Sequence, residues 1–148
     1  MKFERVSTAK ESVALPRRAT TGSAGYDFYA PDDYKILPGD TMLIKTGIKC
    51  QIDDGWMLQI YPRSSMGFKY NVRLANTVGI IDSDYYNNPT NEGEICIKLY
   101  NPDRYLIDIK KGSAFAQGIF MRYGVTDDDA TTGERTGGMG STDGVLGA

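Results

Sequence analysis

The chain has 148 residues, the length of one domain with a buried core, and its 17 basic and 19 acidic residues give a net charge of −2. That charge balance excludes nucleic-acid binding driven mainly by electrostatic attraction to phosphates. No apolar run approaches the roughly 20 residues of a membrane span. The absence of histidine excludes Ser-His and Cys-His nucleophilic pairs, histidine general bases and His-containing zinc sites. We therefore expect a cytoplasmic protein, in which any catalysis uses carboxylates, Lys, Tyr or a metal ion held mainly by its substrate.

From the N-terminus onward, apolar residues recur at every second position in several short segments. Residues 56–61, 95–100 and 105–110 show this alternation most clearly, which is typical of half-buried strands. Many short strands with regular breaks predict an all-β, single-domain fold of the jelly-roll or β-barrel type. The breaks are turn sequences rich in Gly, Pro, Asn and Asp, at 37–40, 53–55, 87–93, 101–103 and 110–112.

Two segments between these strands are less regular. Residues 64–70 are compatible with a short helix, and residues 75–86 with a β-hairpin. The two cysteines, Cys50 and Cys96, fit neither a disulfide framework nor a zinc knuckle, so we interpret both as buried thiols.

The composition changes at Gly124. The last 25 residues hold 7 of the 17 glycines and no aromatic residue, so they cannot pack a core by themselves. The sequence therefore predicts a core domain over 1–123 and a flexible glycine-rich arm over 124–148. The arm is interpreted either as a disordered tail or as a segment whose glycines and hydroxyls wrap an anion.

"YPRSSMG", residues 61–67, follows the first of the clear strands. Arg63 offers a guanidinium, and Ser64 and Ser65 offer hydroxyls beside open backbone N–H groups, a set that suits phosphate oxygens. The alternative is an ordinary turn with a surface arginine.

Three further segments place a polar side chain among apolar ones. In "AGYDF" (24–28) Asp27 either makes a polar pair at the start of an ordinary strand or belongs to a functional site. In "AFAQG" (114–118) Gln117 falls on the strand face of Phe115 and Ile119, where a buried amide needs a partner or a ligand. In "VGIIDSDYYNNP" (78–89) Asp82 stands at the end of an apolar strand, which costs free energy unless the carboxylate is paired or used.

These segments together resemble the five motifs of the trimeric dUTPases in order and spacing. The matching stretches run from residue 24 to 144, and the second and third are the specific ones. The resemblance implies a jelly-roll homotrimer that hydrolyses dUTP to dUMP and pyrophosphate with Mg²⁺. Such an activity limits uracil incorporation into DNA and supplies dUMP for thymidylate synthesis. The stretches are "AGYDF", "PRSSMG", "NTVGIIDSDYYNN", "GSAFAQ" and "RTGGMGSTDG".

The family pattern also implies roles for individual residues. Asp82 would be the general base that orients water toward the α-phosphorus, Gln117 would bind phosphate oxygens, and Asp27 would act through the hydration shell of the metal or the subunit contact. Mg²⁺ would be held by the triphosphate and water, with no direct protein ligand. Each active site would combine residues of all three subunits. The implied substrate-binding residues are Arg63, Ser64 and Ser65 for phosphate, Asn76, Gly79, Ile80 and Ile81 for uracil, Tyr85 for deoxyribose, and Arg135, Met139, Ser141 and Thr142 in the arm.

The chain departs from the family pattern in the third, fourth and fifth motifs. Asn87 replaces the usual glycine and is followed by a short insertion, but Asn is the residue best able to adopt positive φ in its place. Ser113 and Ala114 stand where an acid and an arginine are usual, and Met139 replaces an aromatic ring. Two alternatives therefore stay open, a non-catalytic nucleotide-binding or regulatory protein and a dCTP deaminase. Lys98 stands about where the deaminase would need a glutamate, which favours hydrolysis.

Overall fold

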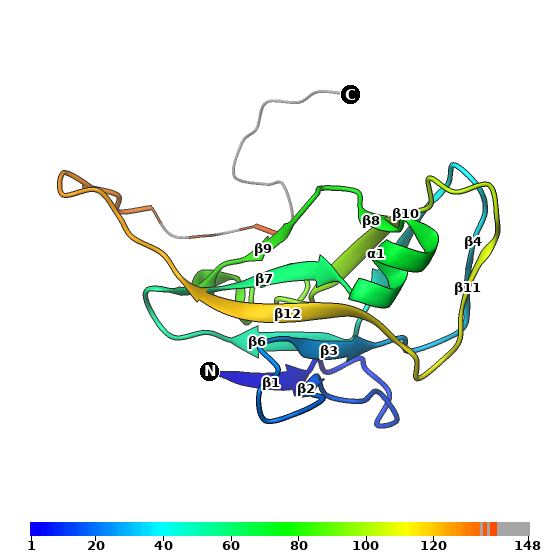
Figure 1. Cartoon of the computed structure of the whole chain (residues 1–148). Coiled ribbons are helices and arrows are strands. Elements are labelled where there is room, and N and C mark those ends of the chain that lie inside the picture. The colour runs from blue at the N-terminus through cyan, green and yellow to red at the C-terminus, as the bar shows by residue number, and fades with distance from the viewer. Residues whose placement is uncertain (134, 136, 139–148) are drawn as a thin grey trace.

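The structure, a computed structural model, describes residues 1–133, 135, 137 and 138. These residues form short strands, one α-helix and one 3-10 turn (Figure 1). The all-β prediction is confirmed, and so is the short helix, which follows β7 after the single residue Arg63. The elements are β1 (Lys2–Arg5), β2 (Arg17–Arg18), β3 (Tyr26–Tyr29), β4 (Tyr34–Ile36), β5 (Thr41–Lys45), β6 (Ile48–Gln51), β7 (Trp56–Pro62), α1 (Ser64–Tyr70), β8 (Arg73–Leu74), β9 (Gly79–Ile81), η1 (Ser83–Tyr85), β10 (Cys96–Tyr100), β11 (Ile107–Ile109) and β12 (Ala114–Arg122).

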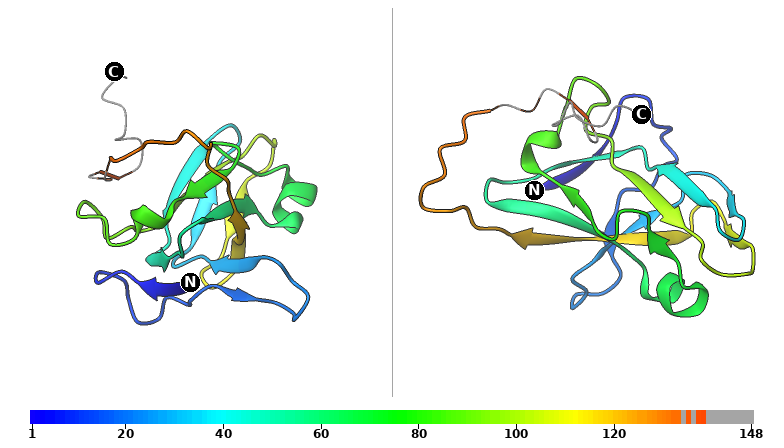
Figure 2. Two further views of the ribbon diagram at one scale, coloured as in Figure 1. Left: turned by 90° about the vertical axis from the view of Figure 1, so that its left-hand side faces the viewer. Right: turned by 90° about the horizontal axis from the view of Figure 1, so that it is seen from above.

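The strands of the described part make four antiparallel sheets. The largest has the order β2-β3-β12-β7-β9, and a second has the order β5-β10-β8. The pairs β1-β6 and β11-β4 complete the set. In none of the four sheets does the first strand pair with the last, so the described strands do not close into a barrel. In two further views the smaller sheets lie around the five-stranded sheet (Figure 2).

The core lies between these sheets and follows the alternation seen in the sequence. Leu58 and Ile60 of β7 and Ile97 and Leu99 of β10 are at most 1% exposed. The inward face of a half-buried strand therefore appears at the expected positions. The third segment follows the pattern only from β11 onward, because Tyr105 is 62% exposed.

The two thiols differ in burial. Cys50 lies in the core at 1% exposure, as predicted, whereas Cys96 is only half-buried. The interpretation of Cys96 as a buried thiol is therefore wrong. Its chain neighbours Ile95 and Ile97 take the core-facing positions, so the alternation turns Cys96 the other way.

A β-bulge in β12 changes which residues face the core. The register against β3 shifts between Ala114 and Ala116. As a result Phe115 and Ala116 are both fully buried, while Gln117 is half-buried and outside the core cluster. The prediction that Gln117 shares the face of Phe115 is therefore wrong, since the bulge adds one residue that simple alternation does not count.

The predicted hairpin over 75–86 is wrong as a paired unit. The segment holds a single strand, β9, which pairs with β7, and β8, which ends just before the segment, pairs with β10 in another sheet. The link between them passes through Thr77, which has a φ of 68°. β9 therefore forms the edge of the five-stranded sheet instead of pairing back onto β8.

The insertion after η1 folds into a compact loop. Asn87 adopts a φ of 58°, as expected for the residue that replaces glycine there, and its backbone N–H donates to Glu92 O at 3.0 Å. Gly93 has a φ of 77°, and a β-carbon at this position would overlap the carbonyl oxygen of Tyr85. The loop thus returns the chain to β10 through a contact that only glycine permits.

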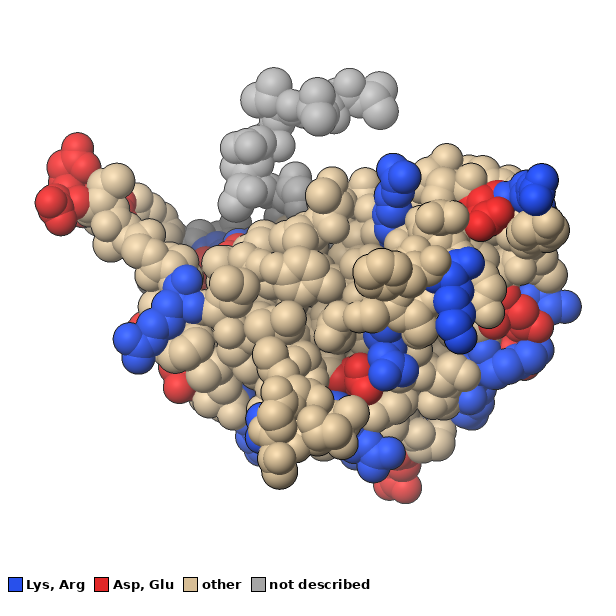
Figure 3. All heavy atoms as spheres, in the orientation of Figure 1, with Lys and Arg blue, Asp and Glu red and all other residues tan. Residues whose placement is uncertain are grey.

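Beyond β12 the chain leaves the sheet. Residues 124–133 are exposed and without strand structure, and acidic side chains gather at the tip of this projecting segment, which includes Asp127 and Asp128 (Figure 3). Elsewhere on the visible face basic and acidic side chains are interspersed. Within the described residues no helix is both long and apolar enough to cross a membrane.

Candidate active site

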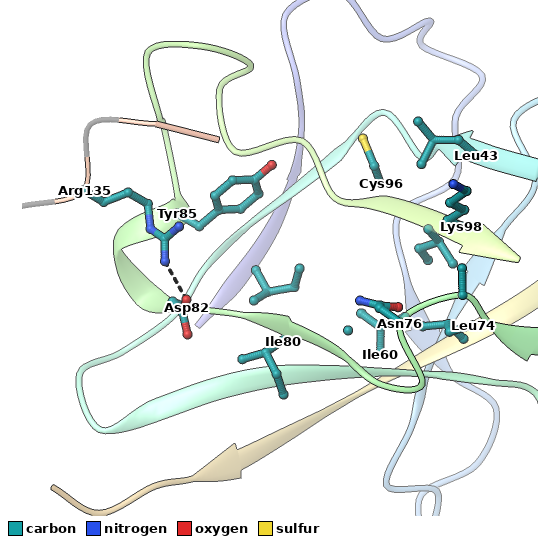
Figure 4. Close-up of a pocket in the computed structure, with 14 residues that line it drawn as sticks. Leu43, Ile60, Leu74, Asn76, Ile80, Asp82, Tyr85, Cys96, Lys98 and Arg135 are labelled. Atoms are coloured by element: carbon teal, nitrogen blue, oxygen red, sulfur yellow. Dashed lines mark hydrogen bonds and ion pairs between the residues drawn. The ribbon is translucent and has the colours of Figure 1, made fainter. Parts of the chain in front are cut away.

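A cavity of about 600 Å³ opens beside β9. Its wall combines the β8–β9 link, β9 itself, the start of η1 and the outward face of β10 (Figure 4). We call it the β9 cavity. It contains every residue predicted from the third motif: Asn76, Gly79, Ile80, Ile81, Asp82 and Tyr85.

The β9 backbone is available at this cavity because β9 is a sheet edge. On one side its residues pair with β7, with Gly79 opposite Ile60 and Ile81 opposite Leu58. An antiparallel edge strand presents backbone N–H and C=O groups on its other side. Gly79 is needed for close packing, since a β-carbon there would lie 3.1 Å from Ile60 Cβ.

Asp82 stands at the rim of the β9 cavity, where β9 passes into η1. Its side chain is 50% exposed, and its Oδ2 lies 2.6 Å from Arg135 Nη2 (Figure 4). Arg135 Nε in turn donates to Asp84 Oδ1 at 2.8 Å. The structure thus brings the predicted residues Asp82 and Arg135 together, and it adds Asp84, to which the sequence assigned no role.

Tyr85 is fixed in the wall of the cavity by its hydroxyl. The hydroxyl donates to Glu94 O at 3.1 Å and accepts from Asn91 Nδ2 at 2.8 Å. Burial raises the pKa of Tyr85, so the phenol stays neutral, and its ring lies 5.8 Å from the Arg135 guanidinium carbon. A ring held in this way has only its face to offer a ligand.

Sequence reasoning missed Leu43 and Cys96 as part of this cavity, and it had considered Lys98 only for its alignment with a deaminase glutamate. Cys96 and Lys98 lie on the same outward face of β10, and Leu43 of β5 pairs directly opposite Lys98. Alternation along 95–100 was the signal that could have placed them. Burial raises the pKa of the Cys96 thiol to about 11, so it is protonated and a poor nucleophile.

A second depression, of about 340 Å³, lies where β3, β12 and the start of α1 meet. It brings together the predicted residues Asp27, Arg63, Ser64, Ser65 and Gln117. We call it the β12 depression. It mixes one guanidinium, two exposed hydroxyls and an amide, which are donors suited to phosphate oxygens.

Strand register explains why distant segments meet in the β12 depression. Gln117 pairs opposite Asp27 of β3 and opposite Tyr61 of β7. Asp27, at 13% side-chain exposure, pairs with Arg63 Nε at 3.1 Å, and Gln117 Nε2 donates to Pro62 O at 3.2 Å. The first, second and fourth motifs therefore form one polar surface.

The structure does not bring the two groups of predicted residues into one pocket. The β9 cavity and the β12 depression share no lining residue in the described chain. Within the same residues, no three His, Cys, Asp or Glu side chains approach closely enough to hold a metal ion. Met139, Ser141 and Thr142 lie outside the described residues, so their predicted roles remain predictions.

Comparison with known proteins gives a consistent result. A family model described as dUTPase matches residues 11–142. A deoxyuridine 5'-triphosphate nucleotidohydrolase of Lactococcus lactis is 43% identical over 143 residues, 95% of each chain. One of Tolumonas auensis is 38% identical over 136 residues, 86% of each chain.

Solved structures agree with these sequence relatives. The crystal structure of dUTPase from Streptococcus mutans superposes with a TM-score of 0.79 at 35% identity, covering 86% of this chain and 99% of that one. A mutant dUTPase of the Staphylococcus aureus phage phi11, described with a structural Mg(II) ion, gives a TM-score of 0.70 at 17% identity, covering 88% and 97%, and bears on the fold alone. The resemblance seen in the sequence is confirmed: the chain belongs to the dUTPase family.

Proposed function

We propose that this chain hydrolyses dUTP to dUMP and pyrophosphate. The observation that carries the proposal is the position of Asp82, a half-exposed carboxylate at the end of an edge strand and at the rim of the β9 cavity. Water attacks the α-phosphorus, the bond from that phosphorus to the bridging oxygen breaks, and pyrophosphate leaves. Asp82 orients the water and takes its proton, as a positioned general base does.

The edge of β9 suits recognition of uracil. The backbone N–H and C=O groups that face away from β7 can pair with the base, and Asn76 adds an amide beside them. Cytosine presents a donor where uracil presents an acceptor, so buried polar groups would be left unpaired. The fixed ring of Tyr85 would pack against deoxyribose and leave no room for a 2′-hydroxyl.

The β12 depression suits the triphosphate. Arg63, Ser64, Ser65 and Gln117 would bind phosphate oxygens there, and Asp27 would act through its ion pair with Arg63. Because the depression and the β9 cavity are separate on one chain, we propose that a complete site joins the cavity of one subunit to the depression of another in a homotrimer. Residues 124–148 would act as the arm of the 1–123 core and place Arg135, Met139, Ser141 and Thr142 over the nucleotide.

Magnesium fits this site only through the substrate. The described residues offer no cluster of metal ligands, and Mg²⁺ in nucleotide sites commonly keeps water and is held by substrate phosphates. When bound, the ion would neutralise the charge of the polyphosphate. Asp27 would bind water around the ion, and Gln117 would bind phosphate oxygens.

A product assay tests the proposed activity. The protein is incubated with dUTP or dCTP and Mg²⁺, and the products are separated by chromatography. We expect dUMP and pyrophosphate from dUTP alone, an activity that would limit uracil in DNA and supply dUMP for thymidylate synthesis in the cytoplasm. Ammonia from dCTP would identify a deaminase, and binding without turnover would identify a regulatory protein; either result would overturn the proposal.

Gly25 offers a separate test of the β12 depression. A β-carbon at Gly25 would overlap Gln117 Oε1, so Gly25→Ala is expected to push that amide away from the phosphate. Loss of one hydrogen bond to a charged group lowers kcat/KM for dUTP about 10- to 100-fold. Gly22→Ala is the matched control, because nothing lies within 4 Å of a β-carbon at that position. Equal kinetics for the two variants would remove Gln117 from phosphate binding.

A further inference from the structure

The η1–β10 loop, residues 86–95, is tied at both ends to a part of the chain outside the β9 cavity. Near its start, the Tyr86 hydroxyl donates to the Glu4 carboxylate of β1. Near its end, the Glu92 carboxylate accepts from the Ser7 hydroxyl and from the Ser7 backbone N–H, which lies 3.2 Å from each oxygen. Among the described residues, none of β1 or β6 lines the β9 cavity. These contacts therefore hold the loop from outside the site.

Lys49 of β6 joins the two ends of the loop. It stands directly opposite Glu4 in the pairing of β1 with β6. Its Nζ donates to Asn87 Oδ1 at 2.7 Å, lies 3.3 Å from Glu92 Oε2 and lies 5.3 Å from the centre of the Tyr86 ring. The Lys49 side chain is only 13% exposed. Its ammonium group is therefore held mainly by the loop, and the β1-β6 sheet serves as the surface on which the loop rests.

The same loop holds the Tyr85 ring in the wall of the β9 cavity. The two partners of the Tyr85 hydroxyl, Asn91 Nδ2 and Glu94 O, lie on either side of Glu92 in the chain. Asn91 is itself oriented by Gly93, whose N–H donates to Asn91 Oδ1 at 3.0 Å. If this part of the loop moves away from the β1-β6 sheet, both partners of the hydroxyl move with it and the ring is displaced.

Glu92 makes the contacts that keep this part of the loop in place. The hydrogen bond from the Ser7 hydroxyl is the largest of the influences that lower the pKa of Glu92, and Lys49 acts in the same direction. The carboxylate therefore stays charged at neutral pH. A neighbouring acid, Glu94, secures the end nearer β10, because its Oε1 accepts from Gly47 N at 2.9 Å. Loss of the Glu92 contacts should thus loosen the loop without unfolding it.

We propose that Glu92 is a positioning residue for the choice of deoxyribose over ribose. It holds the η1–β10 loop against the β1-β6 sheet and so keeps the Tyr85 ring where a 2′-hydroxyl would clash. A ribonucleotide then fits only the minor population in which the ring is displaced, and the size of that population sets how fast UTP is hydrolysed. The inference rests on the proposed function for the role of the sugar, whereas the holding of the loop is measured without nucleotide.

Kinetics with two nucleotides test the role in specificity. Glu92→Ala should raise kcat/KM for UTP about 3- to 10-fold, the size expected from losing one partly exposed, charge-assisted contact. The value for dUTP should hardly change, because dUTP is hydrolysed by the major population. UMP and dUMP are separated by chromatography and quantified. A gain of activity toward the disfavoured nucleotide cannot come from a loss of folded protein, so this result separates positioning from a merely structural role.

Glu11→Ala is the matched control. Glu11 is exposed, and its side chain makes no hydrogen bond or ion pair within the described part of the chain. An unchanged ratio of UTP to dUTP hydrolysis in Glu92→Ala, or an equal rise in Glu11→Ala, would overturn the proposal. A wild type that hydrolyses neither nucleotide would instead refute the proposed function.

Hydrogen exchange tests the holding of the loop without nucleotide. In Glu92→Ala the backbone amides of residues 86–95 should exchange about 3- to 10-fold faster than in the wild type, as measured by mass spectrometry of peptic peptides. Ser7→Ala should have a smaller effect of the same kind. It should add nothing in the Glu92→Ala background, because Glu92 is the partner of the Ser7 hydroxyl. Exchange at the wild-type rate in Glu92→Ala, or additive effects of the two substitutions, would overturn the proposal whether or not dUTP is the substrate.

Discussion

Asp82→Asn is expected to lower kcat for dUTP hydrolysis about 10²- to 10⁴-fold, the usual contribution of a positioned general base. An amide has the shape of the carboxylate but cannot accept a proton from water at neutral pH. The side chain is half exposed and lies at the rim of the β9 cavity, so the substitution leaves the cavity in place. Steady-state kinetics by pyrophosphate release measures the loss.

Nucleotide binding separates a chemical defect from a structural one. Asp82→Asn should bind an α,β-imido analogue of dUTP, which resists hydrolysis, at least as well as the wild type, because a negative charge near the polyphosphate has been removed. Retention of most of kcat by Asp82→Asn would remove Asp82 from the role of base.

Mixing two inactive variants should restore activity if the site is shared between subunits. Asp82→Asn disables the β9 cavity, and the double variant Ser64→Ala/Ser65→Ala disables the β12 depression. Both serines are exposed, so the alanines should leave the fold intact, and losing two hydrogen bonds to phosphate costs at least about 10²-fold in kcat/KM. In a trimer refolded from equal amounts of both chains, about one quarter of the sites combine an intact cavity with an intact depression.

The control is each variant refolded alone, which should stay inactive. Recovery of about a quarter of the wild-type activity on mixing requires that the two regions come from different chains. If the mixture shows only the mean of the two separate activities, each chain carries its own complete site and the shared-site proposal fails. Light scattering on the same samples gives the oligomeric state.

The strands with the clearest alternation could be predicted from the sequence because each has one face in the core. β7 and β10 follow the pattern residue by residue, as the burial of Leu58 and Leu99 shows. The turn chemistry at Asn87 was also predictable, since few other residues tolerate its φ of 58°. These features depend only on neighbouring residues in the chain and on which face of a strand packs against the core.

Features that depend on distant partners could not be predicted in the same way. The residues of β9 look the same whether the strand pairs within a hairpin or with a distant strand. Its actual partner, β7, lies earlier in the chain than β8. The bulge before Gln117 is likewise fixed by packing against β3. The contact of Arg135 with Asp84 joins residues far apart in sequence. The residues around each of them give no indication that the two side chains pair.

The register of β12 also couples ligand binding to folding. Gln117 meets Asp27 only when β12 lies between β3 and β7, a long-range pairing of the kind that slows folding. A chain arrested before this step has no β12 depression, so polyphosphate has nothing to bind. Nucleotide therefore selects the native state over partly folded ones, and its concentration sets how much the melting temperature rises. The amount of native enzyme that survives heat would then follow the size of the nucleotide pool on which it acts.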